Sequence, residues 1–138
     1  MTTEITSQQI SQDLILLLDK VKSSAQTLAE TRGLTRMQLL ALSSIGMHTE
    51  VAMRQVASVL HCDASNVTGI VDRLVAQGLV LREESPQDRR VKTLRLTAKG
   101  QDIVDSIKAE LPTALGCERL DSAERTALHG IIQKLVAS

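Results

Sequence analysis

The chain has 138 residues, with 16 Lys and Arg balanced by 16 Asp and Glu, 43% hydrophobic residues, two Cys and no Phe, Tyr or Trp. This length suits one domain, and its core must be aliphatic. The absence of aromatic side chains excludes an aromatic cage for a quaternary ammonium ion and a stacking platform for single-stranded nucleic acid. No apolar run approaches the roughly 20 residues that cross a bilayer, and two Cys are too few for a disulfide framework. We therefore expect a cytoplasmic protein without membrane contact.

The first predicted element is a long amphipathic helix over residues 8–30, where apolar side chains from Ile10 to Leu28 recur at helical spacing. A second helix is predicted over residues 36–44. It begins after Thr35, which can form a capping box with Gln38. Apolar residues between Met53 and Leu60 predict a third, short helix whose N-cap the sequence does not identify.

A fourth helix is predicted after Asp63, which can cap it, and Gly78 can close it at the C′ position. Together with the short helix before it, this helix makes a helix-turn-helix. Its polar face carries small groups that can bond phosphates or base edges, and the alternative is that Ser65 and Asn66 simply occupy a helix N-terminus. The candidate DNA-reading residues of this helix, about residues 64–77, are Ser65, Asn66, Thr68, Gly69 and Arg73.

A β-hairpin is predicted next, with extended residues 79–84, turn chemistry at 85–88 and a return strand at 91–97. Within the eleven residues from Arg89 to Lys99 there are five basic side chains and no acidic one. An Arg at the hairpin tip suits a narrow minor groove, and Arg90 is the first choice. Asp88 either holds Arg90 or braces the turn, or the two form only an exposed ion pair. The candidate wing residues are Asp88, Arg89, Arg90 and Lys92.

A fifth helix follows Thr97, and Pro112 is expected to bend or end it. The last helix follows a capping box of Asp121 and Glu124. The apolar stripes of the first and last helices can pair with each other or with the same helices of a second chain, and we expect the second arrangement. The expected homodimer interface comprises Ile10, Leu14, Leu17, Leu18, Leu128, Ile131, Ile132 and Leu135.

Net charge is unevenly distributed along the chain. Residues 1–30 hold two basic and four acidic side chains, residues 31–99 hold ten and six, and residues 100–138 hold four and six. The central part is therefore basic and the two ends are acidic. Overall neutrality does not argue against a nucleic-acid partner, because the positive charge is concentrated around the predicted helix-turn-helix and hairpin.

The sequence resembles the MarR family of bacterial transcription regulators over nearly its whole length. The resemblance is carried by the helix segment 66–74 with Gly78, and by Asp88, Arg89 and Arg90 followed by Leu96, Thr97 and Gly100. It implies a mainly α-helical winged helix-turn-helix with a small β-hairpin wing. It also implies one domain, residues 1–138, with a DNA-binding lobe at 34–100 and dimerisation helices at 1–33 and 101–138. The implied function is a repressor that binds palindromic double-stranded DNA as a homodimer and is released by a small-molecule effector.

The resemblance also raises the question of what controls the protein. A carboxylate or phenolic effector is implied between the lobe and the dimer helices, and Arg32 and Arg36 are candidates to hold it unless they are solvated charges. Cys62 precedes the predicted DNA-reading helix, where it is either a redox switch or a small buried side chain. The three His are scattered, so we expect no metal site, no cofactor and no enzymatic activity. A winged helix that binds protein instead of DNA is the remaining alternative.

Overall fold

The computed structural model describes residues 3–137, apart from the side chain of Ala64. Its order is α1 (Ser7–Glu30), α2 (Arg36–Gly46), β1 (Val51–Ala52), α3 (Met53–Leu60), α4 (Ala64–Ala76), β2 (Val80–Glu84), β3 (Lys92–Leu96), α5 (Ala98–Ala114), the 3-10 turn η1 (Cys117–Arg119) and α6 (Ser122–Val136). The three strands form an antiparallel sheet in the order β1-β3-β2. The mainly α-helical fold with a hairpin wing is confirmed.

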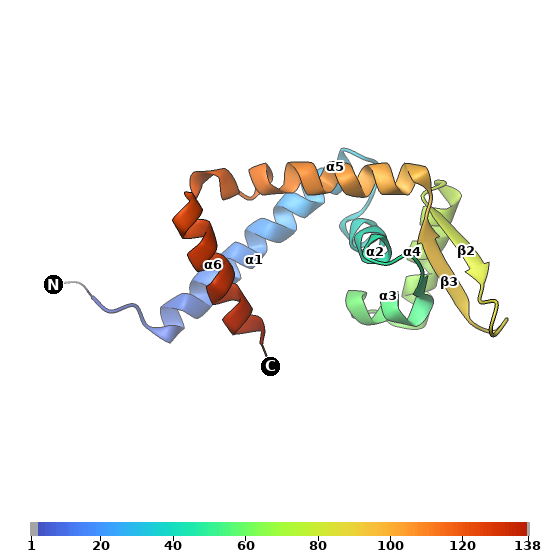
Figure 1. The fold of residues 1–138 in the computed structure, drawn as a ribbon, viewed down its shortest axis with the longest axis horizontal. Coiled ribbons are helices and arrows are strands. Elements are labelled where there is room, and N and C mark those ends of the chain that lie inside the picture. Colours follow the sequence, from blue (N-terminus) through green and yellow to red (C-terminus); the bar gives the residue numbers. More distant parts are fainter. Residues whose placement is uncertain (1–2, 138) are drawn as a thin grey trace.

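Figure 1 shows an elongated chain with two parts. A lobe at one end contains α2, α3, α4 and the hairpin, while α1 and α6 extend away from it toward the other end, and the long helix α5 joins the two. The hydrophobic core lies in the lobe, and its largest fully buried side chains include Leu42, Ile45, Leu74 and Leu94. Ala29 of α1 and Val104 and Ile107 of α5 also belong to this core, so these two helices are anchored in the lobe.

The helix starts follow local sequence signals. Thr35 and Gln38 form the predicted capping box, and Asp121 and Glu124 form theirs. The start of α3 had no predicted cap, and Ala52 has no side-chain acceptor. Instead, the Gln55 Oε1 atom accepts a hydrogen bond from the Ala52 backbone N–H at 2.8 Å, so the cap comes from inside the helix.

The end of α4 is a Schellman motif built on Gly78. This glycine has a φ of +75°, a left-handed conformation that other residues adopt only with strain. The Leu79 N–H donates to the Leu74 carbonyl oxygen at 3.0 Å, and both leucines are buried. The motif therefore ends the helix and turns the chain directly into the wing.

Two features differ from the expectations. A third strand, β1, pairs Val51 with Leu94 in front of α3, where the sequence predicted only a hairpin. Helix α5 continues through Pro112 to Ala114, so the proline does not end it. The helix ends before Gly116, whose φ is +77°.

Candidate DNA interface

Helix α4 presents the predicted DNA-reading residues on its solvent side. Val67, Val71 and Leu74 are buried against the lobe, which fixes the rotation of the helix. The five candidates are all exposed: Ser65, Asn66, Thr68, Gly69 and Arg73. No atom lies within 4 Å of where a Cβ of Gly69 would be, so packing within the chain does not require a glycine there. A glycine inside a helix costs about 1 kcal/mol relative to alanine, and here it leaves room for a close approach from outside.

Asp63 organises the start of α4. Its Oδ1 atom accepts the Asn66 backbone N–H at 2.9 Å and the Ser65 hydroxyl at 2.8 Å. The hydrogen bond from Asn66, followed by that from Ser65, lowers the pKa of the Asp63 carboxyl from its ordinary value. The carboxylate therefore stays ionised at neutral pH and holds the first turn in place.

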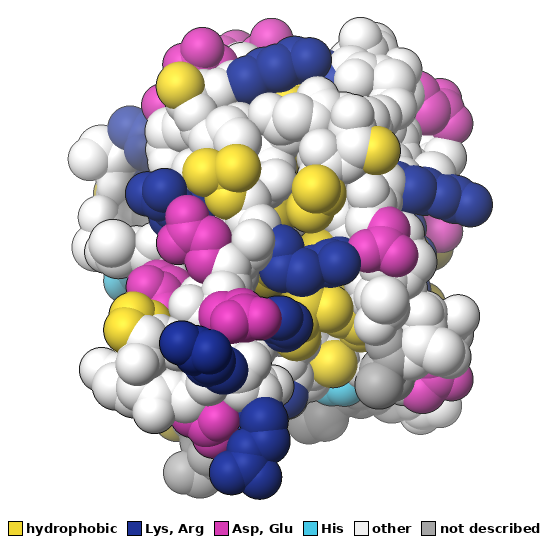
Figure 2. Space-filling view, turned by 90° about the vertical axis from the view of Figure 1, so that its right-hand side faces the viewer, with side chains coloured by type: hydrophobic (Ala, Val, Ile, Leu, Met, Phe, Trp, Pro, Cys, Tyr) yellow, Lys and Arg dark blue, Asp and Glu magenta, His cyan; other side chains and the backbone are white. Residues whose placement is uncertain are grey.

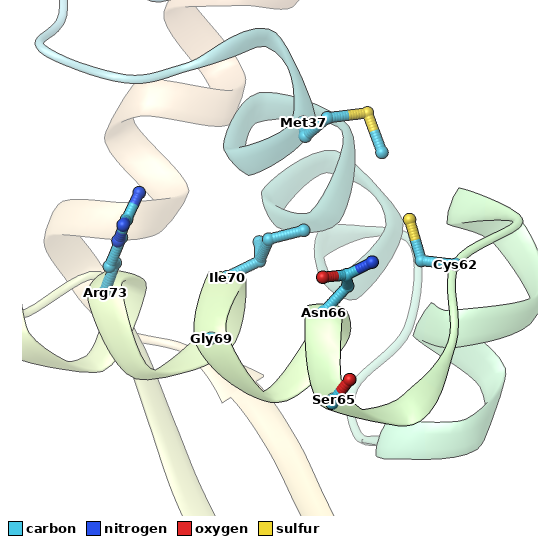
Figure 3. Close-up of a pocket in the computed structure, with 7 residues that line it drawn as sticks. All are labelled: Met37, Cys62, Ser65, Asn66, Gly69, Ile70 and Arg73. Atoms are coloured by element: carbon cyan, nitrogen blue, oxygen red, sulfur yellow. The ribbon is translucent and has the colours of Figure 1, made fainter.

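The candidates of α4 occupy different flanks of its exposed face. Asn66, Ile70 and Arg73 project from one side of α4 toward the first turn of α2, where Met37 lies (Figure 3). These side chains and Met37 line a hollow of about 380 Å³, and Cys62 lines it too. Thr68 lies on the opposite flank, beside Met53 and Ala57 of α3 in a second hollow of about 240 Å³. The sequence grouped the five candidates as one face. In the structure four of them line the first hollow, namely Ser65, Asn66, Gly69 and Arg73, and Thr68 lines the second.

Cys62 is half-buried, and its thiol donates to the Leu60 carbonyl oxygen at 3.4 Å. It lies in the turn between α3 and α4, next to His61, which has a left-handed φ of 52°. The side chain points toward the same hollow as Asn66 (Figure 3). Its surroundings are thus partly apolar, through Met37 and Ile70, and partly polar.

The hairpin holds Arg90 outward at its tip. The Asp88 Oδ1 atom accepts the Arg90 backbone N–H at 3.0 Å and lies 3.5 Å from the Arg90 Nε atom. The Arg90 side chain is nevertheless 92% exposed. Asp88 therefore both braces the turn and approaches the guanidinium. An exposed pair of this kind contributes little stability, so Arg90 can exchange Asp88 for an outside anion at small cost.

The basic run of the hairpin is partly neutralised by the strand that pairs with it. The register sets Glu84 opposite Lys92, and their side chains lie 3.0 Å apart. Arg95 pairs with Glu83, also at 3.0 Å. Figure 2, which looks onto this end of the molecule, shows Lys and Arg side chains interspersed with Asp and Glu instead of a continuous basic surface. An uninterrupted run of positive charge in the sequence is thus not an uninterrupted positive surface.

The hairpin is fixed to α4 by contacts that explain part of the sequence pattern. The Thr97 hydroxyl donates to the Gly78 carbonyl oxygen at 2.7 Å, and its backbone N–H donates to the Leu79 carbonyl oxygen. A Cβ at Gly100 would lie only 2.1 Å from that same Leu79 oxygen. Only glycine allows this close approach between α5 and the start of β2. Arg82 and Asp72 add an ion pair between β2 and α4, and the sequence had assigned no role to Arg82.

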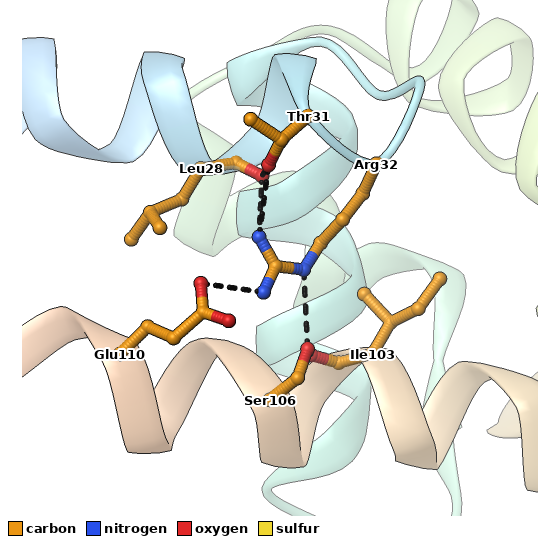
Figure 4. A network of polar contacts seen from close by, with 6 residues as sticks. All are labelled: Leu28, Thr31, Arg32, Ile103, Ser106 and Glu110. Carbon is orange, nitrogen blue, oxygen red and sulfur yellow. Dashed lines mark hydrogen bonds and ion pairs between the residues drawn. The ribbon is translucent and has the colours of Figure 1, made fainter.

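Arg32, a candidate effector contact, joins the end of α1 to α5 (Figure 4). Its guanidinium lies 2.7 Å from the Glu110 carboxylate and donates to the Ser106 hydroxyl and the Leu28 carbonyl oxygen. Only 14% of its side chain is exposed. Arg36, the other candidate, is half-buried at the start of α2, and within residues 3–137 its side chain has no hydrogen-bond or ion-pair partner. A carboxylate that bound Arg32 would have to displace Glu110.

The terminal helices leave their apolar stripes uncovered. All described residues of α6, and those of α1 up to Lys20, are exposed. The eight residues expected at the dimer interface are between 40% and 56% exposed: Ile10, Leu14, Leu17, Leu18, Leu128, Ile131, Ile132 and Leu135. Exposed apolar stripes of this kind are typical of an interaction surface.

Within residues 3–137, no three His, Cys, Asp or Glu side chains are grouped so that they can hold a metal ion. None of the described helices is long and apolar enough to span a membrane.

Comparison with known proteins agrees with this geometry. Residues 32–91, from the end of α1 to the turn of the hairpin, match the model of the MarR family. Over these residues, which make up most of the lobe, the chain is similar to the MarR family. The HTH-type transcriptional repressor MdtR of Bacillus subtilis is 30% identical over 99 residues, which are 69% of this chain and 64% of that protein. The chain thus spans a little under two thirds of this MarR-type relative.

Solved MarR-type structures share the fold. A mutant of Escherichia coli MarR complexed with operator DNA has a TM-score of 0.73 and 23% identity, covering 93% of this chain and 94% of its own. NadR in complex with 4-hydroxyphenylacetate has a TM-score of 0.74 and 22% identity, covering 98% of this chain and 97% of its own. The likeness therefore extends beyond the family-model match to α1, α5 and α6.

Proposed function

We propose that this chain is a transcription regulator that binds palindromic double-stranded DNA as a homodimer. The observation that carries the proposal is the pairing of two exposed elements in one lobe. Helix α4 presents Ser65, Gly69 and Thr68 outward, and the adjacent hairpin presents Arg90, which is 92% exposed. In this arrangement α4 occupies a major groove and the wing reaches the neighbouring minor groove.

The dimer follows from the uncovered helices. Two chains that share the stripes of α1 and α6 bury apolar surface that a single chain leaves in water, and apolar burial stabilises by about 25 cal/mol per Å². A two-fold axis between the chains presents two α4 helices to two half-sites. These half-sites are expected about one helical turn apart, roughly 10 base pairs.

A small-molecule effector is expected to release the protein from DNA. NadR, a protein of the same fold, has been solved with 4-hydroxyphenylacetate. In this chain we assign the control point to the region where Arg32 joins α1 to α5, because its guanidinium is the candidate to hold a carboxylate (Figure 4). A carboxylate or phenolic effector there would compete with Glu110 for Arg32. To act, it must bind the DNA-free arrangement more tightly than the bound one.

Arg90→Ala tests the proposed contact of the wing. Selection from a pool of random duplexes provides the operator, and fluorescence anisotropy measures its affinity at several salt concentrations. Each lost phosphate contact lowers the slope of log affinity against log salt by about 0.9, so the dimer is expected to lose about 1.8. Arg95→Ala is the matched control, because Arg95 lies within β3 instead of at the tip and pairs with Glu83.

Two results would contradict the proposal at different levels. A wild-type protein that selects no sequence from the pool, or binds no duplex, would remove the function itself. An unchanged salt slope for Arg90→Ala, with normal operator selection by the wild type, would remove Arg90 from the interface but leave the function standing.

A further inference from the structure

A small basic hollow lies between the start of α3 and the return strand of the wing. It measures about 250 Å³ and is lined by Ala52, Met53, Arg54, Arg90, Val91 and Lys92. Three of these six residues are cations, and no carboxylate lines the hollow. Glu84 and Asp88 do not line the hollow; Glu84 pairs with Lys92, and Asp88 pairs with Arg90. The hollow therefore has the charge and size for a small anionic group.

Arg54 differs from the two wing cations because it is free. It is exposed in the first turn of α3, and within residues 3–137 its guanidinium makes no hydrogen bond or ion pair. Lys92 and Arg90 approach the hollow from another element, the hairpin, and each has a carboxylate nearby. Arg54 has no carboxylate partner within the described residues, so an anion can bind it without displacing one.

Arg54 also lies between the two elements that read DNA in the proposed function. On one side it lines the hollow shared with Arg90 and Lys92 of the wing. On the other side it lines the separate hollow that contains Val67 and Thr68 of α4. The side chain is thus placed between the flank of α4 and the base of the wing.

In duplex DNA, the position of Arg54 between α4 and the wing corresponds to the phosphate backbone between two grooves. A major groove and its neighbouring minor groove are separated by one phosphate backbone, so a protein that occupies both grooves must straddle that backbone. We propose that Arg54, at the hollow that it shares with the wing, binds a phosphate of the strand that separates the two grooves. This inference rests on the proposed function and adds a contact from α3 that neither the basic run nor the family pattern assigns.

The contact contributes to affinity and not to sequence choice, because phosphates carry no base information. The guanidinium can bind two phosphate oxygens at once, which fixes the distance between wing and α4 on the DNA. Loss of the contact is therefore expected to weaken binding to operator and random duplexes by the same factor.

Arg54→Gln tests the inference in the full-length protein with the selected operator. We expect the salt slope of the dimer to fall by about 1.8, or 0.9 for each Arg54. The ratio of operator affinity to random-duplex affinity is expected to stay constant. Arg54→Lys keeps the charge and should retain most of the slope. Lys108→Gln removes an exposed cation of α5 and is the control for a general charge effect.

A set of operators with single neutral methylphosphonate linkages locates the contact. Wild-type protein is expected to lose affinity when one particular linkage per half-site, between the two grooves, is neutralised. Arg54→Gln should lose nothing further at that linkage and behave like the wild type at the others. Circular dichroism of each variant verifies that it remains folded.

Each outcome separates the inference from the function on which it rests. If the wild type selects an operator but Arg54→Gln keeps its full salt slope, or loses affinity additively at every linkage, the phosphate contact is wrong and the function stands. If the wild type selects no operator, the function itself fails. If inorganic phosphate binds the wild type saturably and Arg54→Gln abolishes that binding while the salt slope for the operator stays unchanged, the hollow is a site for a free anion, and the DNA contact is overturned.

Discussion

The lobe and the terminal helices use the same kind of amphipathic helix with opposite results. In the lobe, Leu42, Val56 and Val71 are all fully buried within one chain. On α1 and α6, Leu18 is 52% exposed and Ile131 is 56% exposed. Both regions have apolar residues at helical spacing, so periodicity alone does not distinguish them. What differs is whether the chain supplies a second apolar face, and within residues 3–137 none covers the terminal helices.

The comparison explains how one short chain can contain a stable unit and an incomplete one. The lobe closes its core with α2, α3, α4, the sheet, and the parts of α1 and α5 that carry Ala29, Val104 and Ile107. The outer parts of α1 and α6 have no such cover within the described residues. Substitutions in the two regions are therefore expected to damage different properties.

The largest expected effect comes from charge in the uncovered stripe. Leu14→Glu and Ile132→Glu should each convert the dimer to a monomer and lower operator affinity by a factor of about 100 or more, because linked half-sites gain roughly 10² to 10⁴ from simultaneous binding. The lobe itself should keep its fold. Analytical ultracentrifugation and anisotropy measure the two properties, and a monomer that binds the operator with wild-type affinity would contradict the assembly.

A second substitution disturbs only the closed lobe. Gly100→Ala places a Cβ about 2.1 Å from the Leu79 carbonyl oxygen, and the backbone shift that follows is expected to cost about 1–3 kcal/mol. Gly69→Ala is the matched control, since nothing lies within 4 Å of its Cβ position, and it should stabilise α4 by up to about 1 kcal/mol. Urea unfolding measures both, and equal effects of the two substitutions would contradict the close approach.

The smallest expected effect concerns pH and the cap of α4. The pKa of Asp63 is lowered by hydrogen bonds from the Asn66 backbone and the Ser65 hydroxyl, below its ordinary value of 3.8. A lowered folded-state pKa means that the ionised cap stabilises the lobe fully above that value, and that this stability is lost as the pH falls through the folded pKa. Asn caps without titrating, so Asp63→Asn should be slightly less stable than the wild type at neutral pH. Urea unfolding should show this difference disappearing in acid, and a difference independent of pH would contradict the role of the charge.

The sequence predicted the helices well because their starts and ends are local. The capping box of Thr35 and Gln38 and the glycine at position 78 act within one or two turns of chain. The short strand β1 was missed because two residues have no periodicity of their own, and Val51 becomes a strand only by pairing with Leu94. Of the two effects expected of Pro112, an end of the helix is wrong, since α5 continues past it to Ala114.

The candidate site was predicted less completely than the fold. Its residue types and their order along the chain were visible in the sequence, and the family match over residues 32–91 agrees with them. The sequence counted Lys92 and Arg95 as free positive charge, whereas Glu84 and Glu83 pair with them across the hairpin. It also passed over Arg54, which stands outside the basic run.

The sequence by itself therefore determined which helices form, where most of them begin, and which of their faces are apolar, because hydrogen-bonded caps and helical spacing depend on neighbours a few residues away. Only the tertiary structure decided which charges remain free and which apolar faces remain open. Strand register pairs Lys92 with Glu84, and the fold brings Arg32 to Glu110 while leaving Arg54 without a partner among the described residues. These outcomes depend on groups that are distant in the chain and adjacent in space.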